Sequence, residues 1–245
     1  MGASKKKKFY NLKSDTDDSV TFPAKNRFRK ENIDTVIAKI TEYTKNVKAP
    51  VMEFVKIMTN DPFKILVGTL LSSRTNDNTT SKVLANFFMN VEKADDINDM
   101  SVKELEELIF PVGFYRTKAK HLKELPIVLK NKFNGIIPET IEELVQLPGV
   151  GRKTANLVMI LAFEQPAMCV DVHVHRISNR IGIIKTKNPL DSELALREVI
   201  PLKYWMKYNF ILVAFGQNLC KPTFPRCTIC PVEKYCEKYS VNLRP

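Results

Sequence analysis

Four of the five cysteines lie close together near the end of the chain, at a spacing that could bind a metal centre. Cys220, Cys227, Cys230 and Cys236 follow the pattern C-x6-C-x2-C-x5-C. Zinc sites with four thiolate ligands are common, but zinc ribbons usually pair two C-x-x-C units, and only Cys227 and Cys230 form one here. Four thiolates from one compact stretch suit a [4Fe–4S] cluster, which needs one ligand per iron. Zinc stays the alternative, and the spacing favours the cluster.

The chain as a whole is basic. Its 245 residues carry 38 Lys and Arg against 27 Asp and Glu, a formal net charge of +11. Such an excess favours polyanionic partners, nucleic acid first, because phosphate contacts release counterions. Lys221 and Arg226 lie in the loop between the first two cysteines, where a metal centre could hold them against phosphate. We therefore expect both side chains to contact a nucleic-acid backbone.

A second chemical feature is the segment Leu-Pro-Gly-Val-Gly-Arg-Lys-Thr-Ala at residues 147–155, which lies between two amphipathic stretches. This is the helix–hairpin–helix pattern. Gly149 and Gly151 are expected to allow a turn that other residues would strain, and to leave bare N–H groups that can approach a phosphate. The positive end of the second helix, which starts near Arg152, would face the same anion. The motif predicts a grip on the backbone rather than on bases.

The hairpin also carries a candidate nucleophile. Lys153 falls in the first turn of the second helix, and a helix N-terminus disfavours an ammonium ion, so that an amine there loses its proton more easily. The alternative is an ordinary exposed lysine on a DNA-facing helix. Eighteen residues later Asp171 lies among valines, where a carboxylate needs a partner, a catalytic role or the N-terminus of a helix to cap. His173 is expected to be structural or to contact phosphate.

The elements that position these residues are expected to be helices. Only 8 glycines, few alternating apolar and polar runs and no strand–helix repeat argue against sheet folds, so the predicted class is all-α. Asp61-Pro62 predicts the start of one helix, and Ser101 with Glu104 and Thr140 with Glu143 predict capping boxes at two more. Apolar residues at helical spacing predict further helices within 33–40, 122–129, 155–161, 174–181, 194–200 and 210–215.

The remaining composition limits where the protein works. No apolar run approaches the roughly 18–20 residues that span a bilayer, and the start MGASKKKK lacks the apolar stretch of a secretion signal. We expect no membrane partner and an intracellular protein, in the cytoplasm or nucleoid of a prokaryote or in the nucleus of a eukaryote. Residues 1–28, rich in Lys, Ser and Asp, are expected to form a disordered tail.

The hairpin, Lys153, Asp171 and the cysteine spacing, in this order and at these intervals, resemble the endonuclease III family of helix–hairpin–helix glycosylases. The resemblance covers roughly residues 30–240. It implies a helix–hairpin–helix glycosylase fold, with a six-helix barrel domain at residues 55–165. A helical iron–sulfur cluster domain would combine residues 29–54 and 166–245, with DNA lying across the groove between the two domains.

The resemblance also implies an activity. A bifunctional DNA glycosylase and AP lyase of base excision repair would flip an oxidised pyrimidine out of double-stranded DNA. Lys153 would attack C1′, displace the base, form a Schiff base and promote β-elimination of the 3′ phosphate, while Asp171 would stabilise positive charge on the sugar and help to deprotonate the lysine. The four cysteines would bind a [4Fe–4S] cluster, and the protein is expected to be a monomer that acts on damaged pyrimidines and abasic sites.

Two further positions are implied by the resemblance. Residues 71–77 match the family segment that sends a side chain into the vacated base stack, usually a glutamine, and here Arg74 stands there. Gly113-Phe114-Tyr115 matches a loop whose apolar wedge is commonly leucine, so Phe114 is a candidate intercalating residue. Ordinary packing in the core is the alternative for Phe114.

Other functions stay open at this point. The chain could be a non-catalytic DNA-binding iron–sulfur protein or an electron-transfer protein. It could also be a mismatch-specific glycosylase of the same superfamily. The adenine-excising branch lacks the catalytic lysine and uses a glutamate within the helix corresponding to residues 65–74, where this chain has none. A thymine-mismatch branch typically has tyrosine at the lysine position. Lys153 argues against both branches.

Overall fold

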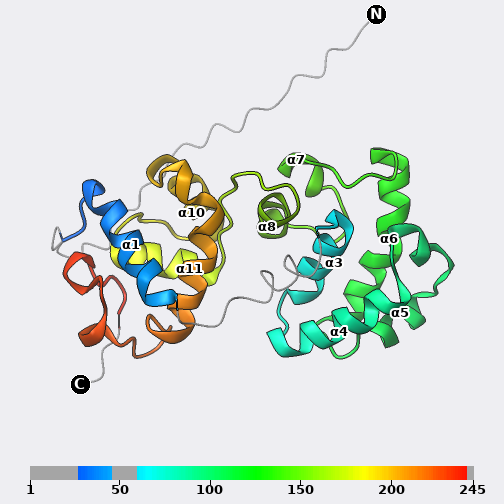
Figure 1. Cartoon of the computed structure of the whole chain (residues 1–245), viewed down its shortest axis with the longest axis horizontal. Coiled ribbons are helices and arrows are strands. Elements are labelled where there is room, and N and C mark those ends of the chain that lie inside the picture. The colour runs from blue at the N-terminus through cyan, green and yellow to red at the C-terminus, as the bar shows by residue number, and fades with distance from the viewer. Residues whose placement is uncertain (1–26, 46–59, 242–245) are drawn as a thin grey trace, which may run out of the picture.

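The computed structural model describes residues 27–45 and 60–241, and every regular element in these ranges is a helix (Figure 1). The predicted all-α class is confirmed. The predicted disordered tail falls on residues 1–28, of which 1–26 lie outside the described residues. The α-helices are α1 (Ile33–Thr44), α3 (Pro62–Ser72), α4 (Asp77–Asn90), α5 (Val102–Ile109), α6 (Tyr115–Phe133), α7 (Ile141–Leu144), α8 (Arg152–Ala162), α9 (Val172–Ile181), α10 (Pro189–Val199) and α11 (Trp205–Asn218).

The local start signals act where the sequence predicts them. The Asp61 carboxylate accepts a hydrogen bond of 2.8 Å from the N–H of Phe63, and Pro62 opens α3. Ser101 and Glu104 form a complete capping box on α5, in which each side chain bonds the backbone N–H of the other residue. These bonds satisfy donors that a helix N-terminus leaves without an intrahelical partner.

At α7 the predicted capping box is only half formed. The Thr140 hydroxyl accepts from the N–H of Glu143 at 3.2 Å, as expected. The Glu143 carboxylate, however, accepts from the Thr140 hydroxyl at 2.8 Å instead of from its backbone N–H. The helix that follows has only four residues, because the chain turns at once into the hairpin.

A first hydrophobic core joins α3 to α8. It includes the fully buried Ile65, Leu66 and Val67 of α3, together with Leu122 of α6 and Val158 of α8. Each such side chain contributes about 2 kcal/mol relative to exposure. Because α3 packs against α8, α4 and α6, this core fixes the helix that carries Lys153 relative to the turns that carry Arg74 and Phe114.

A second core is built from the two ends of the described chain. Ile33, Val36, Ile37 and Ile40 bury the predicted apolar stripe of α1 against a cluster contributed mainly by α9, α10 and α11. Figure 1 shows α1, α10 and α11 on one side of the molecule and α3 to α6 on the other, with α8 nearest the middle. No helix in the described part of the chain is long and apolar enough to cross a membrane.

Candidate active site

The hairpin lies between α7 and α8, and its first glycine is required by geometry. Gly149 has φ +75°, in the left-handed region that favours glycine. A Cβ at this position would lie 2.4 Å from Nδ1 of His121 on α6, so the turn also packs against that helix without room for a side chain. Val150 is buried beneath the turn.

The expectation that Gly151 is needed for its conformation is wrong. Its backbone is extended, with φ −93° and ψ 174°, which any residue can adopt. A Cβ there would meet nothing within 4 Å. Gly151 occupies the N-cap position of α8 without a side-chain capping bond, so its contribution is an uncovered helix N-terminus.

Lys153 and Asp171 come together at the junction of the two cores. Nζ of Lys153 lies 3.8 Å from Oδ2 of Asp171, and the side chains are 54% and 10% exposed. Asp171 is the N-cap of α9, where its Oδ1 accepts hydrogen bonds of 2.9 Å from the N–H groups of His173 and Val174. The carboxylate therefore caps a helix with one oxygen and faces the amine with the other.

His173 follows Asp171 and is half-buried. Burial lowers the pKa of its imidazole, although the Asp171 carboxylate opposes this effect. Its Nδ1 lies 3.1 Å from the Arg176 guanidinium, which also donates to the carbonyl oxygen of Cys220 at 3.0 Å. The first turn of α9 is thus tied to the cysteine segment.

Arg152, a predicted DNA contact, has a partner inside the protein. Its guanidinium bonds the Glu193 carboxylate of α10 through two nitrogens, at 3.1 and 2.6 Å. Glu193 is buried and also accepts from Arg197 at 2.8 Å. The two residues are 41 positions apart in the sequence, so no local motif could predict this ion pair. It connects the first turn of α8 to the second core.

Arg74 and Phe114 lie on two neighbouring turns, after α3 and before α6. The guanidinium carbon of Arg74 is 5.5 Å from the centroid of the Phe114 ring. Phe114 is 62% exposed, so the alternative of ordinary core packing is wrong. Both side chains are available at the surface.

Sequence reasoning missed Lys118, in the first turns of α6. Its side chain is buried, and its Nζ donates to the carbonyl oxygens of Leu71 and Ser73 at 2.9 and 2.6 Å. Lys118 also lines an open hollow together with Phe114, His121 and Gly149 of the hairpin. Nothing in the sequence separates this lysine from the other lysines of α6.

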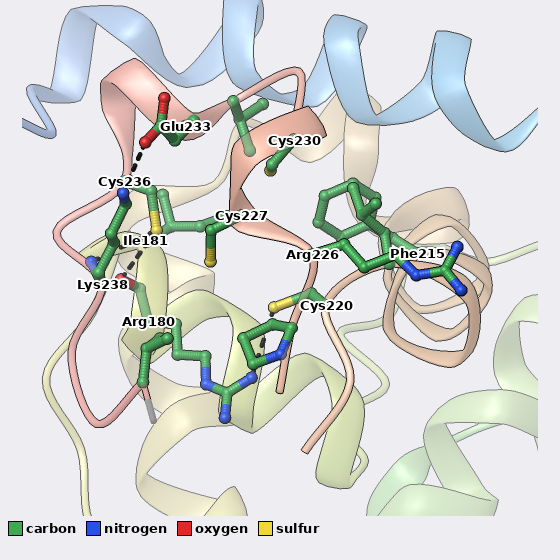
Figure 2. Close-up of a pocket in the computed structure, with 14 residues that line it drawn as sticks. Arg180, Ile181, Phe215, Cys220, Arg226, Cys227, Cys230, Glu233, Cys236 and Lys238 are labelled. Carbon is green, nitrogen blue, oxygen red and sulfur yellow. Dashed lines mark hydrogen bonds and ion pairs between the residues drawn. The ribbon is translucent and has the colours of Figure 1, made fainter. Parts of the chain in front are cut away.

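The four clustered cysteines surround one hollow, as Figure 2 shows. Among the other residues that line it are the apolar Phe215, Leu219 and Val232. Burial raises the pKa of the Cys230 thiol to about 11 and that of the Cys236 thiol to about 12. A metal that binds these sulfurs as thiolates would have to displace their protons.

Positive charges lie beside these sulfurs. The Arg180 guanidinium, buried at the end of α9, lies 3.6 Å from Sγ of Cys220 and donates to the carbonyl oxygens of Lys221 and Pro222 at 2.6 and 2.7 Å. Lys238 also lines the hollow. Both cations would offset the negative charge on these sulfurs once the thiols lost their protons. Arg180 holds the loop in which the exposed Lys221 and Arg226 lie.

Within the described ranges, no three His, Cys, Asp or Glu side chains form a group that could hold a single metal ion. Four thiolates around one zinc at about 2.3 Å would be less than about 4 Å from one another. A multi-iron cluster instead takes one thiolate ligand on each iron atom, and here the four cysteines line one common hollow.

Comparisons with known proteins identify relatives of the chain. A family model described as HhH-GPD superfamily base excision DNA repair protein matches residues 67–202. Endonuclease III of Thermotoga maritima is 42% identical over 179 residues, which cover 73% of this chain and 84% of that protein. Endonuclease III-like protein 1 of Gallus gallus is 40% identical over 177 residues, and the chain spans 63% of its length.

Solved structures are similar in fold as well. The structure of a trapped endonuclease III–DNA covalent intermediate matches with TM-score 0.77 and 32% identity, over 86% of this chain and 97% of that one. A thermostable thymine-DNA glycosylase matches with TM-score 0.73 and 28% identity, over 85% and 97%. The chain therefore belongs to the HhH-GPD superfamily of base excision DNA repair proteins, and within it to the endonuclease III family.

Proposed function

We propose that Lys153 is the nucleophile and Asp171 the assisting carboxylate of this DNA glycosylase and AP lyase. The observation that carries the proposal is the 3.8 Å approach of the Lys153 amine to Oδ2 of Asp171. Lys153 is half exposed, so a sugar can reach it, while Asp171 is held rigidly by the cap that it forms on α9. A nucleophile next to a fixed acceptor is the arrangement that nucleophilic catalysis needs.

The chemistry follows from this pair. Asp171 takes a proton from the ammonium of Lys153, and the free electron pair of Nζ forms a bond to C1′ of the sugar. The bond from C1′ to the damaged base breaks, and the base leaves with the bonding electrons. Opening of the sugar gives a Schiff base, loss of a proton from C2′ breaks the C3′–O bond, and the 3′ phosphate leaves. The departing base takes up the proton that Asp171 accepted, so Asp171 becomes a carboxylate again and stabilises the positive charge that develops on the sugar as it opens to the Schiff base.

We propose double-stranded DNA with damaged pyrimidines or abasic sites as the partner. Gly149 and Gly151 would offer backbone N–H groups to a phosphate at the start of α8. Arg152, although paired with Glu193, keeps 38% of its side chain exposed and can add positive potential there. The remaining proposed contacts are His173, Lys221, Arg226 and, in the vacated stack, Arg74 and Phe114.

We propose a [4Fe–4S] cluster bound by Cys220, Cys227, Cys230 and Cys236. Four thiols on one hollow, with the cations Arg180 and Lys238 beside them, support it. When bound, the cluster would fix the loop that carries Lys221 and Arg226. Iron and sulfide analysis should give about four of each per chain. Bound zinc in their place would contradict the proposal.

The domain assignment is also a proposal. The two hydrophobic cores support a barrel domain at residues 55–165 and a cluster domain that combines 29–54 with 166–245, although 46–59 lie outside the described residues. We propose a monomer that works where the cell keeps its DNA, in the nucleoid of a prokaryote or the nucleus of a eukaryote.

A mismatch-specific glycosylase is the second candidate, because a thymine-DNA glycosylase is 28% identical in sequence over nearly its whole length. Duplexes with one defined lesion decide between them. The proposed enzyme should cut at an oxidised pyrimidine and at an abasic site far faster than at thymine opposite guanine. Preferred removal of mismatched thymine would favour the second candidate, and salt-sensitive binding without any cleavage would favour a non-catalytic DNA-binding protein.

A further inference from the structure

The turns that carry Arg74 and Phe114 both hold a conformation that side chains rarely adopt. Arg74 has φ +52° and Phe114 has φ +58°. A left-handed backbone costs a residue with a side chain on the order of 1 kcal/mol or more, so the surroundings must impose it. The contacts around these two turns therefore offset that cost.

The two turns touch through their backbones. The N–H of Gly113 donates to Oγ1 of Thr75 at 3.0 Å. A Cβ at Gly113 would lie 2.3 Å from the carbonyl oxygen of Arg74, so only glycine permits this approach. Together with the contact between the Arg74 guanidinium and the Phe114 ring, these interactions make one rigid unit of two turns that are about 40 residues apart.

The Lys118 ammonium ties this unit to α3 and α6. It donates to the carbonyl oxygens of Leu71 and Ser73 and lies 3.4 Å from the Thr75 hydroxyl. Leu71 and Ser73 are at the C-terminal end of α3, where carbonyls lack intrahelical partners and attract a cation. Lys118 is only 8% exposed, and a buried ammonium is costly unless such acceptors surround it.

We propose that Lys118 is a positioning residue that holds Arg74 and Phe114 together as a single probe, which enters the DNA stack when the damaged nucleotide leaves it. The proposal rests on the glycosylase function proposed above. In this role Lys118 would act through Arg74 and Phe114 rather than on the sugar or the base. It acts by keeping two surface side chains at a fixed separation before they meet DNA, so that no ordering is needed on binding.

A pair of DNA substrates separates this role from damage to the active site. One substrate carries an oxidised pyrimidine within a fully paired duplex, and the other carries the same lesion in a short bubble of unpaired bases. The probe is needed only where the lesion leaves an intact stack. Lys118→Met should lower kcat/KM about tenfold or more on the paired duplex and less than about threefold on the bubble.

Three further variants sharpen the test. Lys118→Arg keeps a cation and should recover part of the lost activity on the paired duplex. Arg74→Ala and Phe114→Ala should each show the same preference for the bubble, and adding Lys118→Met to either should cost less than it does in the wild type, because all three residues act as one unit. If Lys118→Met does not fold, Thr75→Val, which removes the shared hydroxyl, should give the same split between substrates.

Equal losses on duplex and bubble, or fully additive losses in the double variants, would overturn the role of Lys118. The outcome is distinct from failure of the proposed function, because a wild-type protein that cuts neither substrate would reject the glycosylase assignment itself. Fluorescence of 2-aminopurine opposite the lesion gives a second readout. It should rise when wild type binds the paired duplex and rise less with Lys118→Met.

Discussion

At the scale of single residues, the two oxygens of Asp171 serve different purposes. Oδ1 accepts from two backbone N–H groups at the start of α9, and Oδ2 faces the Lys153 amine. The cap fixes the rotamer that brings the second oxygen to the amine. The helix cap thus depends on Oδ1 and the proposed catalytic role on Oδ2, and substitutions at Asp171 can separate the two effects.

Asp171→Asn keeps an oxygen that can accept the capping bonds but removes the charge. We expect a melting temperature close to that of wild type and single-turnover base excision slower by about 100-fold or more. Asp171→Ala should lose the same activity and in addition about 1 kcal/mol of stability with the cap. An Asn variant that excises the base at the wild-type rate would contradict the role of the carboxylate.

Lys118 gives a prediction about pH. Burial lowers the pKa of its amine from 10.5 to about 8, so between these values the unfolded chain binds a proton here that the folded chain lacks. The contribution of this site to the free energy of unfolding therefore rises from pH 8 to pH 10.5 and is constant below pH 8. Between pH 8 and pH 10.5, the unfolding midpoint of wild type should therefore rise relative to that of Lys118→Met. A difference that does not change with pH would contradict this account.

At the scale of elements, the hairpin shows how a short turn is held in place. Gly149 bends the chain in a left-handed conformation against His121, and Gly151 then leaves the N-terminus of α8 uncovered. Gly149 is needed for the conformation of the turn, and Gly151 leaves room for a phosphate to approach the N-terminus of α8. The motif therefore combines two different requirements on the same residue type.

Alanine at each glycine tests this difference. Gly149→Ala should destabilise the protein by about 1–2 kcal/mol or more, because the backbone is left-handed and His121 must move. Gly151→Ala should change stability by less than about 1 kcal/mol, because the smaller entropy of the unfolded chain offsets the poorer N-cap that alanine makes. Both should weaken binding to undamaged duplex. Thermal unfolding and fluorescence anisotropy at several salt concentrations measure the two effects, and equal destabilisation by both changes would contradict the assignment.

The helices could largely be predicted because their signals are local. Asp61-Pro62 and Ser101 with Glu104 act within one helical turn, and the apolar stripe of α1 needs only its own spacing. Thr140 with Glu143 shows the limit, because the same residue pair can bond in two ways and the following chain decides which.

For the site, the sequence could predict the residues that belong to short motifs but not their partners from distant segments. Lys153, Asp171 and the cysteines belong to short patterns, but the structure adds partners from distant segments. Glu193 bonds Arg152 from 41 residues away, and Lys118 reaches carbonyl groups more than 40 residues before it. Every residue has a backbone carbonyl oxygen, so the sequence cannot predict which of them accepts a hydrogen bond from a distant lysine. Only the tertiary structure shows it.

At the scale of the whole molecule, Lys153 and Asp171 lie where the two hydrophobic cores meet. Lys153 lies in the first turn of α8, whose buried apolar residues belong to the first core, and Asp171 caps α9, whose buried apolar residues belong to the second. Their separation therefore depends on how the two cores are joined. The Arg152–Glu193 pair spans this junction next to the nucleophile.

Removing Glu193 should weaken the junction. Its side chain is 5% exposed, whereas those of its partners Arg152 and Arg197 are 38% and 28% exposed. Glu193→Ala should therefore lower the free energy of unfolding by about 2 kcal/mol, less than the loss expected when a fully buried ion pair is broken. Excision should slow as well, because the start of α8 loses its tie to α10. Glu42→Ala, which breaks an exposed pair with Lys45, is the matched control and should change neither quantity. A Glu193 variant as stable and active as this control would contradict the junction's role.

Borohydride reduction reports whether the Lys153 amine forms the Schiff base with the sugar. Wild type incubated with abasic-site DNA and borohydride should form a covalent complex, and mass analysis should find the sugar on Lys153. Lys153→Gln should form none, while Lys132→Gln, an exposed lysine at the end of α6, should be trapped as wild type is. A complex that persists in Lys153→Gln, or a sugar attached to another lysine, would show that Lys153 is not the nucleophile.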